Sequence, residues 1–212
     1  MLLKGKPVLW YSLFEFEKSD VEQVILVTAE EDIEYCRKNI VEKYNLSKVT
    51  DIISGGNERY YSVYNGLSKV KGDIVLIHDG ARPLINQNII EKCIAEAKKS
   101  KACVVGVPVK DTIKMVSEGM FIEKTPDRNS LWITQTPQAF DSELIKTAYE
   151  KMIEKAQSAG IENLPDTKQG QNTGIENIFM DSFCEKTQSE IWNILKSGKY
   201  IPQEILNEHD WG

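Results

Sequence analysis

Residues 74–83 read IVLIHDGARP, and this stretch does most to define the fold. Four consecutive aliphatic residues suit a β-strand that is covered on both faces of a sheet. The polar turn that follows begins at His78, where an open α/β sheet binds its ligands, beyond the carboxyl end of a strand. The stretch therefore predicts a buried strand with a candidate site at its end.

Helical and strand-like patterns alternate along the first half of the chain. Aliphatic runs predict strands over residues 24–27, 49–53, 73–77 and 102–107. Apolar residues at helical spacing predict helices over residues 8–16, 30–44, 58–70 and 86–99. Strands that alternate with helices form a parallel or mixed sheet with right-handed crossovers, so we expect an α/β fold.

The pattern changes after Pro108. Residues 112–116 and 120–123 flank the turn sequence SEG and predict a β-hairpin arm, and residues 131–134 could re-enter the sheet. Asp141 is expected to cap a helix that runs to about residue 159. We assign residues 1–160 to one domain, with the arm at about 111–128. No confident domain is assigned to residues 161–212, which carry 9 acidic and 4 basic side chains and so −5 of the total charge of −6.

Composition and charge exclude several classes of protein. The 212 residues are 41% hydrophobic and 27% charged, as in an ordinary globular protein. A sequence pI near 5.2 argues against nucleic-acid binding by bulk charge. No apolar run is long enough to cross a membrane, and the four cysteines lack the C-x-x-C spacing of a metal or redox motif. We expect a cytoplasmic protein without nucleic-acid or membrane partners.

The turn after residue 77 has the residue types of a phosphate and metal site. Asp79 could bind Mg²⁺, Gly80 allows close approach of a ligand, and Arg82 could hold phosphate oxygens with its forked donors. The alternative is a polar turn in which Asp79 and Arg82 merely pair at the surface. His78 is interpreted as an ordered structural imidazole.

Two further groups of residues are candidates for ligand contacts. The sequence GGNER at residues 55–59, with Ser62 one turn later, could present backbone N–H groups to an anion or a base, or could form a simple turn with Asn57 as the helix N-cap. Polar and basic residues at 110–114, 127–128 and 134–138 could neutralise a phosphorylated substrate, although each alone is typical of solvated surface. The chain contains no Walker A loop, G-x-G-x-x-G fingerprint or G-x-S-x-G elbow.

Taken together, these segments resemble the family of cytidylyltransferases that join CTP to 2-C-methyl-D-erythritol 4-phosphate in non-mevalonate isoprenoid synthesis. The resemblance covers residue 4 to about residue 160. Its matching strings are GKPVL at 5–9, GGNER at 55–59, HDGARP at 78–83, KDTIK at 110–114, Asp127-Arg128, and QTPQAF at 135–140.

The resemblance implies a Rossmann-like, mostly parallel sheet flanked by helices, with a homodimer formed through the protruding hairpin arm. It implies Mg²⁺ as cofactor and CTP as co-substrate, with Asp79 as metal ligand and with Asp79 and Arg82 as catalytic residues. The nucleotide would contact Gly56, Asn57, Ser62 and Gly80. The phosphorylated sugar alcohol would contact Thr112, Thr136 and Arg128, the last reaching into the partner's site.

The resemblance also shows two departures. The family begins with a strand and a glycine-rich loop before the region matched by Leu2-Leu3, so we expect the domain to be N-terminally truncated and nearly inactive as given. The C-terminal segment lacks the family's Asn-Ile-Lys sequence and reads ENIF at residues 176–179.

Two alternatives remain open at this point. A ribitol 5-phosphate cytidylyltransferase would share the fold and the sequence QTPQ, although Gly80-Ala81 and residues 127–132 favour the methylerythritol branch. A non-catalytic remnant or interaction protein would keep the sheet and the arm without the activity.

Overall fold

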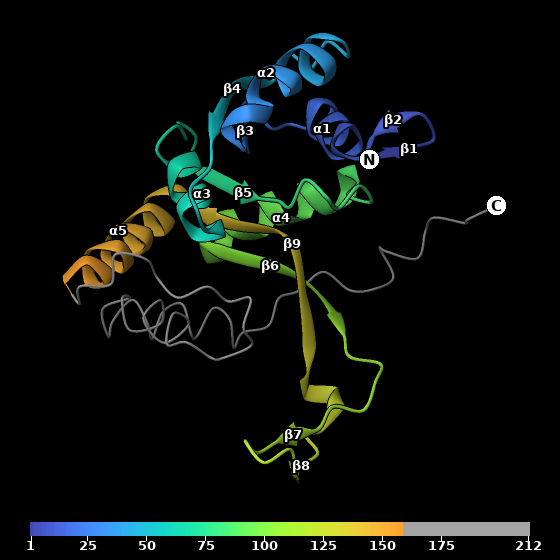
Figure 1. The fold of residues 1–212 in the computed structure, drawn as a ribbon, viewed down its shortest axis with the longest axis vertical. Coiled ribbons are helices and arrows are strands. Elements are labelled where there is room, and N and C mark those ends of the chain that lie inside the picture. Colours follow the sequence, from blue (N-terminus) through green and yellow to red (C-terminus); the bar gives the residue numbers. More distant parts are fainter. Residues whose placement is uncertain (159–212) are drawn as a thin grey trace.

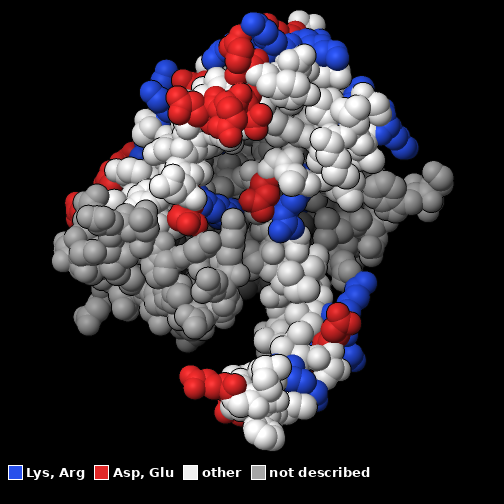
Figure 2. Space-filling view, viewed as in Figure 1, with Lys and Arg blue, Asp and Glu red and all other residues white. Residues whose placement is uncertain are grey.

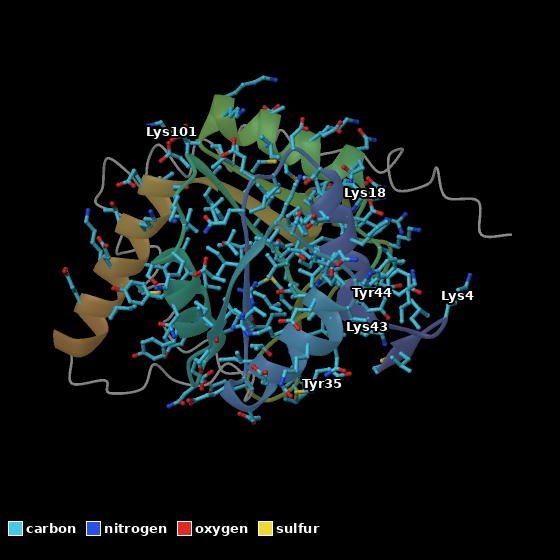
Figure 3. All side chains as sticks on the ribbon, turned by 90° about the horizontal axis from the view of Figure 1, so that it is seen from above. Lys4, Lys18, Tyr35, Lys43, Tyr44 and Lys101 are labelled. Carbon is cyan, nitrogen blue, oxygen red and sulfur yellow. The ribbon has the colours of Figure 1, made fainter. Side chains whose placement is uncertain are left out.

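The computed structural model describes residues 1–158, which form an α/β fold with helices on both sides of its strands (Figure 1). The chain starts with a small hairpin of β1 (Leu2–Leu3) and β2 (Lys6–Pro7), followed by the helix α1 (Val8–Lys18). The hairpin turns through left-handed backbone at Lys4 and Gly5, with φ of 46° and 79°. Lys4 points away from the body of the protein (Figure 3).

The strands β3 (Val24–Thr28) and β4 (Val49–Ser54) form a parallel pair. The predicted helix at 30–44 between them is confirmed only in part, because it is divided into a 3₁₀ turn (Glu30–Asp32), α2 (Ile33–Cys36) and a π-helical segment (Arg37–Glu42). Its apolar side nevertheless packs as predicted, with Cys36 and Ile40 buried against Leu26 of β3. Packing against the sheet is thus kept although the winding of the helix varies.

The next elements continue the predicted alternation: α3 (Arg59–Leu67), β5 (Ile74–Ile77), α4 (Gln87–Ser100) and β6 (Ala102–Pro108). Asn86 caps α4, because its side-chain oxygen accepts a hydrogen bond from the Ile89 amide at 3.0 Å. The helix ends at Ser100, and the residue that follows it, Lys101, adopts left-handed backbone with φ of 64°.

The strand β9 (Trp132–Asp141) is longer than the predicted strand at 131–134. It lies between β5 and β6 and runs antiparallel to both, so this three-stranded sheet is antiparallel, whereas β3 and β4 form a separate parallel pair. The sequence did not predict this extension, because Pro137 lacks the amide hydrogen that a strand residue donates to its neighbouring strand. The structure accommodates the proline at an irregularity: β9 pairs with β6 up to Thr134 and again from Gln138, and residues 135–137 between them have no ladder partner.

The predicted hairpin arm is present as an antiparallel pair of β7 (Met115–Val116) and β8 (Ile122–Lys124), followed by a 3₁₀ turn (Arg128–Ser130). It extends away from the rest of the protein (Figure 1). The last described element is α5 (Ser142–Ser158), and Asp141 caps it as predicted, accepting from the Leu144 amide at 3.0 Å. The segment 161–212 lies outside the described residues.

The core has two main layers around the sheet of β5, β9 and β6. On one face α4 buries Ile90, Cys93 and Ala97 completely, and on the other α3 and α5 pack against Val75 and Ile77. The cysteines at 36, 93 and 103 are buried and free, as expected for core positions. Among the helices of residues 1–158, none combines the length and apolar character of a membrane span.

The strands β3 and β5 differ in one respect from the sequence expectation. Four consecutive aliphatic residues, at 24–27 as at 74–77, predict a strand that is covered on both faces, yet only Leu26 of β3 is buried, and all four residues of β5 are half-buried. The reason is a cavity of about 1490 Å³ that all residues of both strands line. Aliphatic composition therefore predicted the strands correctly but not their exposure.

Candidate active site

The centre of the candidate site is the Asp79 carboxylate, two residues beyond the end of β5. Its Oδ1 accepts a hydrogen bond from a terminal guanidinium nitrogen of Arg59 at 3.1 Å, and its Oδ2 accepts one from Nε of Arg82 at 3.1 Å. Arg82 also donates to the side-chain oxygen of Gln135 on β9. One carboxylate is thus held between two guanidinium groups that come from different parts of the fold.

The arginines keep Asp79 ionised. Partial burial by itself would raise the pKa of this carboxyl, but the hydrogen bonds and positive charges of Arg59 and Arg82 together outweigh burial and lower the pKa below its usual value. The Asp79 side chain is 35% exposed, so the charged group remains accessible to a ligand.

His78 belongs to a hydrogen-bonded chain behind Asp79. Its Nε2 lies 3.1 Å from the carbonyl oxygen of Arg82, and its Nδ1 lies 3.1 Å from Oγ1 of Thr136. The same Oγ1 accepts the Asp79 amide at 3.3 Å. Since a carbonyl can only accept, the imidazole carries its proton on Nε2 and Nδ1 accepts from the threonine hydroxyl.

The environment of His78 favours the neutral ring. Burial is the main cause that lowers the pKa of His78, and it outweighs the opposing effects of the Arg82 carbonyl and the Asp79 charge. A neutral imidazole with both nitrogens engaged supports the interpretation of His78 as a structural residue. Its place is to fix the backbone of the turn that presents Asp79.

Glycines bring the backbone close at two points of the site. A Cβ on Gly56 would lie 2.3 Å from Cβ of Tyr61, and a Cβ on Gly80 would lie 2.7 Å from Cδ1 of Leu9. Neither position accepts a side chain without movement of its neighbours. The Gly56 amide donates to Oγ of Ser62 at 3.1 Å, which ties the turn after β4 to the first turn of α3.

The sequence alternative in which Asn57 caps α3 is wrong. Glu58 occupies the N-cap position, with extended backbone and no capping hydrogen bond from its side chain. Asn57 is exposed and, with Gly56 and Ser62, lines a smaller cavity of about 480 Å³. Three of the predicted nucleotide contacts therefore share one hollow.

The large cavity connects the predicted residues to one another. Its lining includes Arg59, Ser62, Asp79 and Gly80. Figure 2 shows charged side chains of both signs beside a hollow in the middle of this face. The structure thus brings together the residues predicted near the nucleotide and the metal.

Two predicted substrate contacts lie elsewhere in the same chain. Thr112 and Arg128 are exposed and belong to the segments that lead into and out of the hairpin of β7 and β8. These segments extend away from the sheet (Figure 1). Thr136 by contrast lies in the cluster, bonded to His78 and the Asp79 amide.

Sequence reasoning missed two members of the cluster, Arg59 and Gln135. Both belong to quoted motifs, GGNER and QTPQ, but neither was assigned a role. The signal available for Arg59 was its place at the start of a helix, shortly after the glycine pair 55–56. Its pairing with Asp79, twenty positions away in the sequence, is decided only by the fold.

A divalent cation at this site would have one protein carboxylate. Within residues 1–158, no three His, Cys, Asp or Glu side chains are grouped so as to hold a metal ion. Mg²⁺ commonly takes one or two carboxylates together with substrate phosphates, and the ionised, accessible Asp79 fits that pattern.

The fold and the site define an α/β protein with a charged, glycine-lined site at the carboxyl ends of its strands, the usual place for a nucleotide. The family described as IspD, 2-C-methyl-D-erythritol 4-phosphate cytidylyltransferase, matches residues 1–170. The chain belongs to this family.

Relatives and solved structures agree with this assignment. The chain is 51% identical over 156 residues to the 2-C-methyl-D-erythritol 4-phosphate cytidylyltransferase of Caldanaerobacter subterraneus subsp. tengcongensis, covering 72% of this chain and 69% of the relative. The protein of the same name from Lachnoclostridium phytofermentans is 49% identical over 153 residues, covering 72% and 66%. The chain thus spans about two thirds of the length of these relatives.

Among solved structures, the 4-diphosphocytidyl-2C-methyl-D-erythritol synthase from Anaerococcus prevotii superposes with a TM-score of 0.69 at 29% identity, covering 84% of this chain and 74% of that one. The structure from Thermus thermophilus, at 22% identity and a TM-score of 0.57, shares the fold. The predicted family and the α/β fold class are therefore confirmed.

Proposed function

We propose that this chain is a cytidylyltransferase that transfers CMP from CTP to 2-C-methyl-D-erythritol 4-phosphate. A phosphate oxygen of the sugar-alcohol phosphate attacks the α-phosphorus of CTP and forms the new P–O bond. The bond from the α-phosphorus to the bridging oxygen breaks, and pyrophosphate leaves with the electron pair. The observation that carries the proposal is the Asp79 carboxylate held between Arg59 and Arg82 beside two glycine turns.

This reaction needs alignment and charge neutralisation rather than a protein nucleophile. Arg82 and Arg59 supply positive charge next to Asp79 and can turn toward phosphate oxygens, since their side chains are 44% and 58% exposed. Arg82 and Asp79 are the proposed catalytic residues. Both are held at the end of β5 by the bonds of His78 and Thr136 described above.

A divalent cation, proposed as Mg²⁺, would be held by Asp79 and by phosphate oxygens of CTP. It would supply charge neutralisation at the triphosphate. The chain's own part is to keep Asp79 ionised and aimed into the cavity, which the two arginines and the Thr136 hydroxyl do.

The remaining site residues divide by their location. Gly56, Asn57, Ser62 and Gly80 are the proposed contacts of the nucleotide, which their common position around the cavities supports. The sugar-alcohol phosphate is proposed to contact Thr112, Thr136 and Arg128. The Thr136 hydroxyl already donates its proton to His78. It could therefore only accept a hydrogen bond from the substrate, or act on the substrate through His78 and Asp79, which it positions.

The distance of the arm from the cluster supports a homodimer in which Arg128 reaches the partner's site. Met115, Phe121 and Ile122 of the arm are 50%, 77% and 63% exposed, an apolar surface that a second copy could cover. Sedimentation of the full chain is expected to show a dimer, and Phe121→Asp is expected to shift it to monomer. A wild-type chain that stays monomeric at all concentrations would contradict this part of the proposal.

A cytoplasmic location of the protein is proposed together with the enzymatic activity.

The test of the activity uses the full chain with CTP, Mg²⁺ and one phosphorylated alcohol at a time. Mass spectrometry is expected to detect the cytidine diphosphate product with 2-C-methyl-D-erythritol 4-phosphate and not with ribitol 5-phosphate. Asp79→Asn should remove product formation, whereas Asp51→Asn, on β4, should leave it unchanged. The low turnover expected from the sequence stays a prediction that the same assay measures.

Binding provides the second measurement. Calorimetry is expected to show CTP binding that Asp79→Asn weakens in the presence of Mg²⁺. Absence of both CTP binding and product would overturn the proposal and favour an interaction protein. Product with ribitol 5-phosphate alone would favour the other alcohol.

A further inference from the structure

Gln135 on β9 makes a contact in the site that the proposed reaction does not yet use. Its amide oxygen accepts a hydrogen bond from Nη1 of Arg82, and Nε of the same guanidinium donates to Oδ2 of Asp79 at 3.1 Å. Since a guanidinium group can only donate, the oxygen and not the nitrogen of the Gln135 amide faces Arg82. Arg82 is thus held at two nitrogens, by the turn after β5 and by β9.

The irregularity of β9 brings Gln135 to this place. β9 pairs with β5 only from Gln138 onwards, so residues 135–137 run beside the turn that follows β5. They have no partner on β6 either, because that ladder stops at Thr134 and resumes at Gln138. In a regular strand successive side chains point to opposite faces, yet those of Gln135 and Thr136 both bond to this turn. The interrupted ladder therefore re-aims a side chain toward the site, as β-bulges do.

The backbone of Arg82 is already fixed without Gln135, but its side chain is not. The Arg82 amide donates to the Asp79 carbonyl at 2.9 Å, and the Arg82 carbonyl oxygen lies 3.1 Å from Nε2 of His78. The side chain is long and 44% exposed, and ordering such a side chain when a ligand arrives weakens binding. The bond from Gln135 orders the guanidinium before any ligand binds.

Gln135 is also a neutral partner, so the site keeps a net positive charge. Arg59 and Arg82 carry two positive charges and Asp79 carries one negative charge, which leaves one positive charge in excess. A glutamate at position 135 would offer an acceptor at the same place but would cancel that excess. The N–H groups of the Arg82 fork that do not bond to Asp79 or Gln135 can donate to a phosphate oxygen.

We propose that Gln135 is a positioning residue, which holds the Arg82 guanidinium in place for a phosphate group without cancelling its charge. The inference rests on the proposed function, because that function supplies the phosphate group. The alternative is that the amide merely fills space beside the turn. The two explanations differ in what the loss of the amide does to the motion of Arg82, rather than in what it does to the fold.

Nitrogen NMR of the arginine side chains tests the positioning without any turnover. The chain has four arginines, and Arg82→Lys identifies the Arg82 signal by its loss. Gln135→Met keeps the length of the side chain but lacks the acceptor. It is expected to lower the order parameter of the Arg82 Nε–H from that of a rigid group, about 0.85, to that of a flexible one, below about 0.6.

Two further variants control this measurement. Gln135→Glu restores an acceptor and is expected to keep the order parameter of the wild-type chain. Thr134→Val, at the exposed neighbouring position, should leave it unchanged as well. Gln135→Ala provides the same test as Gln135→Met if circular dichroism shows that methionine disturbs the fold.

Calorimetry with inorganic pyrophosphate, in the absence of metal, tests the charge. Gln135→Glu is expected to weaken binding about fivefold, the effect of one unit charge at about 4 Å in water. Gln135→Met is expected to weaken it about twofold to tenfold, because the Arg82 side chain must then be ordered on binding. The two variants thus lose affinity for different reasons, and only the methionine variant loses the rigid Arg82 signal.

The outcomes separate this inference from the proposed function. An Arg82 side chain that stays equally ordered in Gln135→Met would overturn the inference. So would pyrophosphate binding by Gln135→Glu as tight as that of the wild type, or a wild-type chain that does not bind pyrophosphate. If Arg82 loosens and binding weakens as expected but the wild-type chain forms no product from CTP, the positioning role stands and the proposed transferase activity fails.

Discussion

Replacement of Thr136 by valine tests the hydrogen-bonded chain that supports Asp79. Valine keeps the branched shape but removes the hydroxyl, so Nδ1 of His78 loses its donor and the Asp79 amide loses its acceptor. A fully buried group left without its partner costs about 1–3 kcal/mol. Thr136 and His78 are only half-buried, so the cost per group is near the lower end of this range. We expect Thr136→Val to lower the free energy of unfolding by about 1–2 kcal/mol in total.

Urea unfolding followed by circular dichroism measures this loss directly. The same loss corresponds to a fall in melting temperature of roughly 2–8 °C for a chain of this size. Thr134→Val is the matched control, since Thr134 lies on the same strand but is exposed, and it should change stability by less than about 0.5 kcal/mol.

Nitrogen NMR of the histidine rings separates the proposed cause from a general loss of packing. The chain has histidines only at 78 and 209, so the spectrum is simple. In the wild-type chain the proton of His78 should be on Nε2, and Thr136→Val should shift the Nδ1 resonance. Equal stability of the two valine variants, or a proton on Nδ1 in the wild type, would refute the reasoning.

Three further outcomes follow from packing and charge. Ile90→Ala, at a completely buried position, is expected to lower the free energy of unfolding by about 2–5 kcal/mol in urea titrations. Gly56→Ala should cost about 1–3 kcal/mol because the new Cβ meets Tyr61 at 2.3 Å, whereas Gly72→Ala, with its nearest neighbour at 3.8 Å, should cost less than about 0.5 kcal/mol. Burial lowers the pKa of His78, so on acidification the imidazole binds a proton in the unfolded chain before it does so in the folded chain. The free energy of unfolding should therefore fall as the pH drops below about 6.5. His78→Asn should lessen that fall between about pH 7 and 5, as measured by urea unfolding at each pH.

The sequence predicted the elements whose signals are local. Four aliphatic residues in succession identified β5, and Asp141 identified the start of α5, because both signals depend on neighbours within a few positions. The extension of β9 through Pro137 was missed, since proline is tolerated there only because residues 135–137 lie outside the ladder. That irregularity depends on β6, more than thirty positions away.

The candidate site divides in the same way. The turn at Asp79 and Gly80 was found from its position after a strand, and Gly56 and Ser62 from a glycine pair before a helix. Arg59 was not found, because its partner Asp79 is twenty residues distant and only the packing of α3 beside β5 brings them within 3.1 Å.

By itself the sequence determined the α/β class, the family and the residue types of the site, because periodicity and short motifs reside in neighbouring residues. Only the tertiary structure decided that Asp79 is bound by two arginines and that β3 and β5 face a cavity. Aliphatic side chains indicate that other elements can pack on both faces of a strand. Which elements do so depends on contacts between residues far apart in the chain.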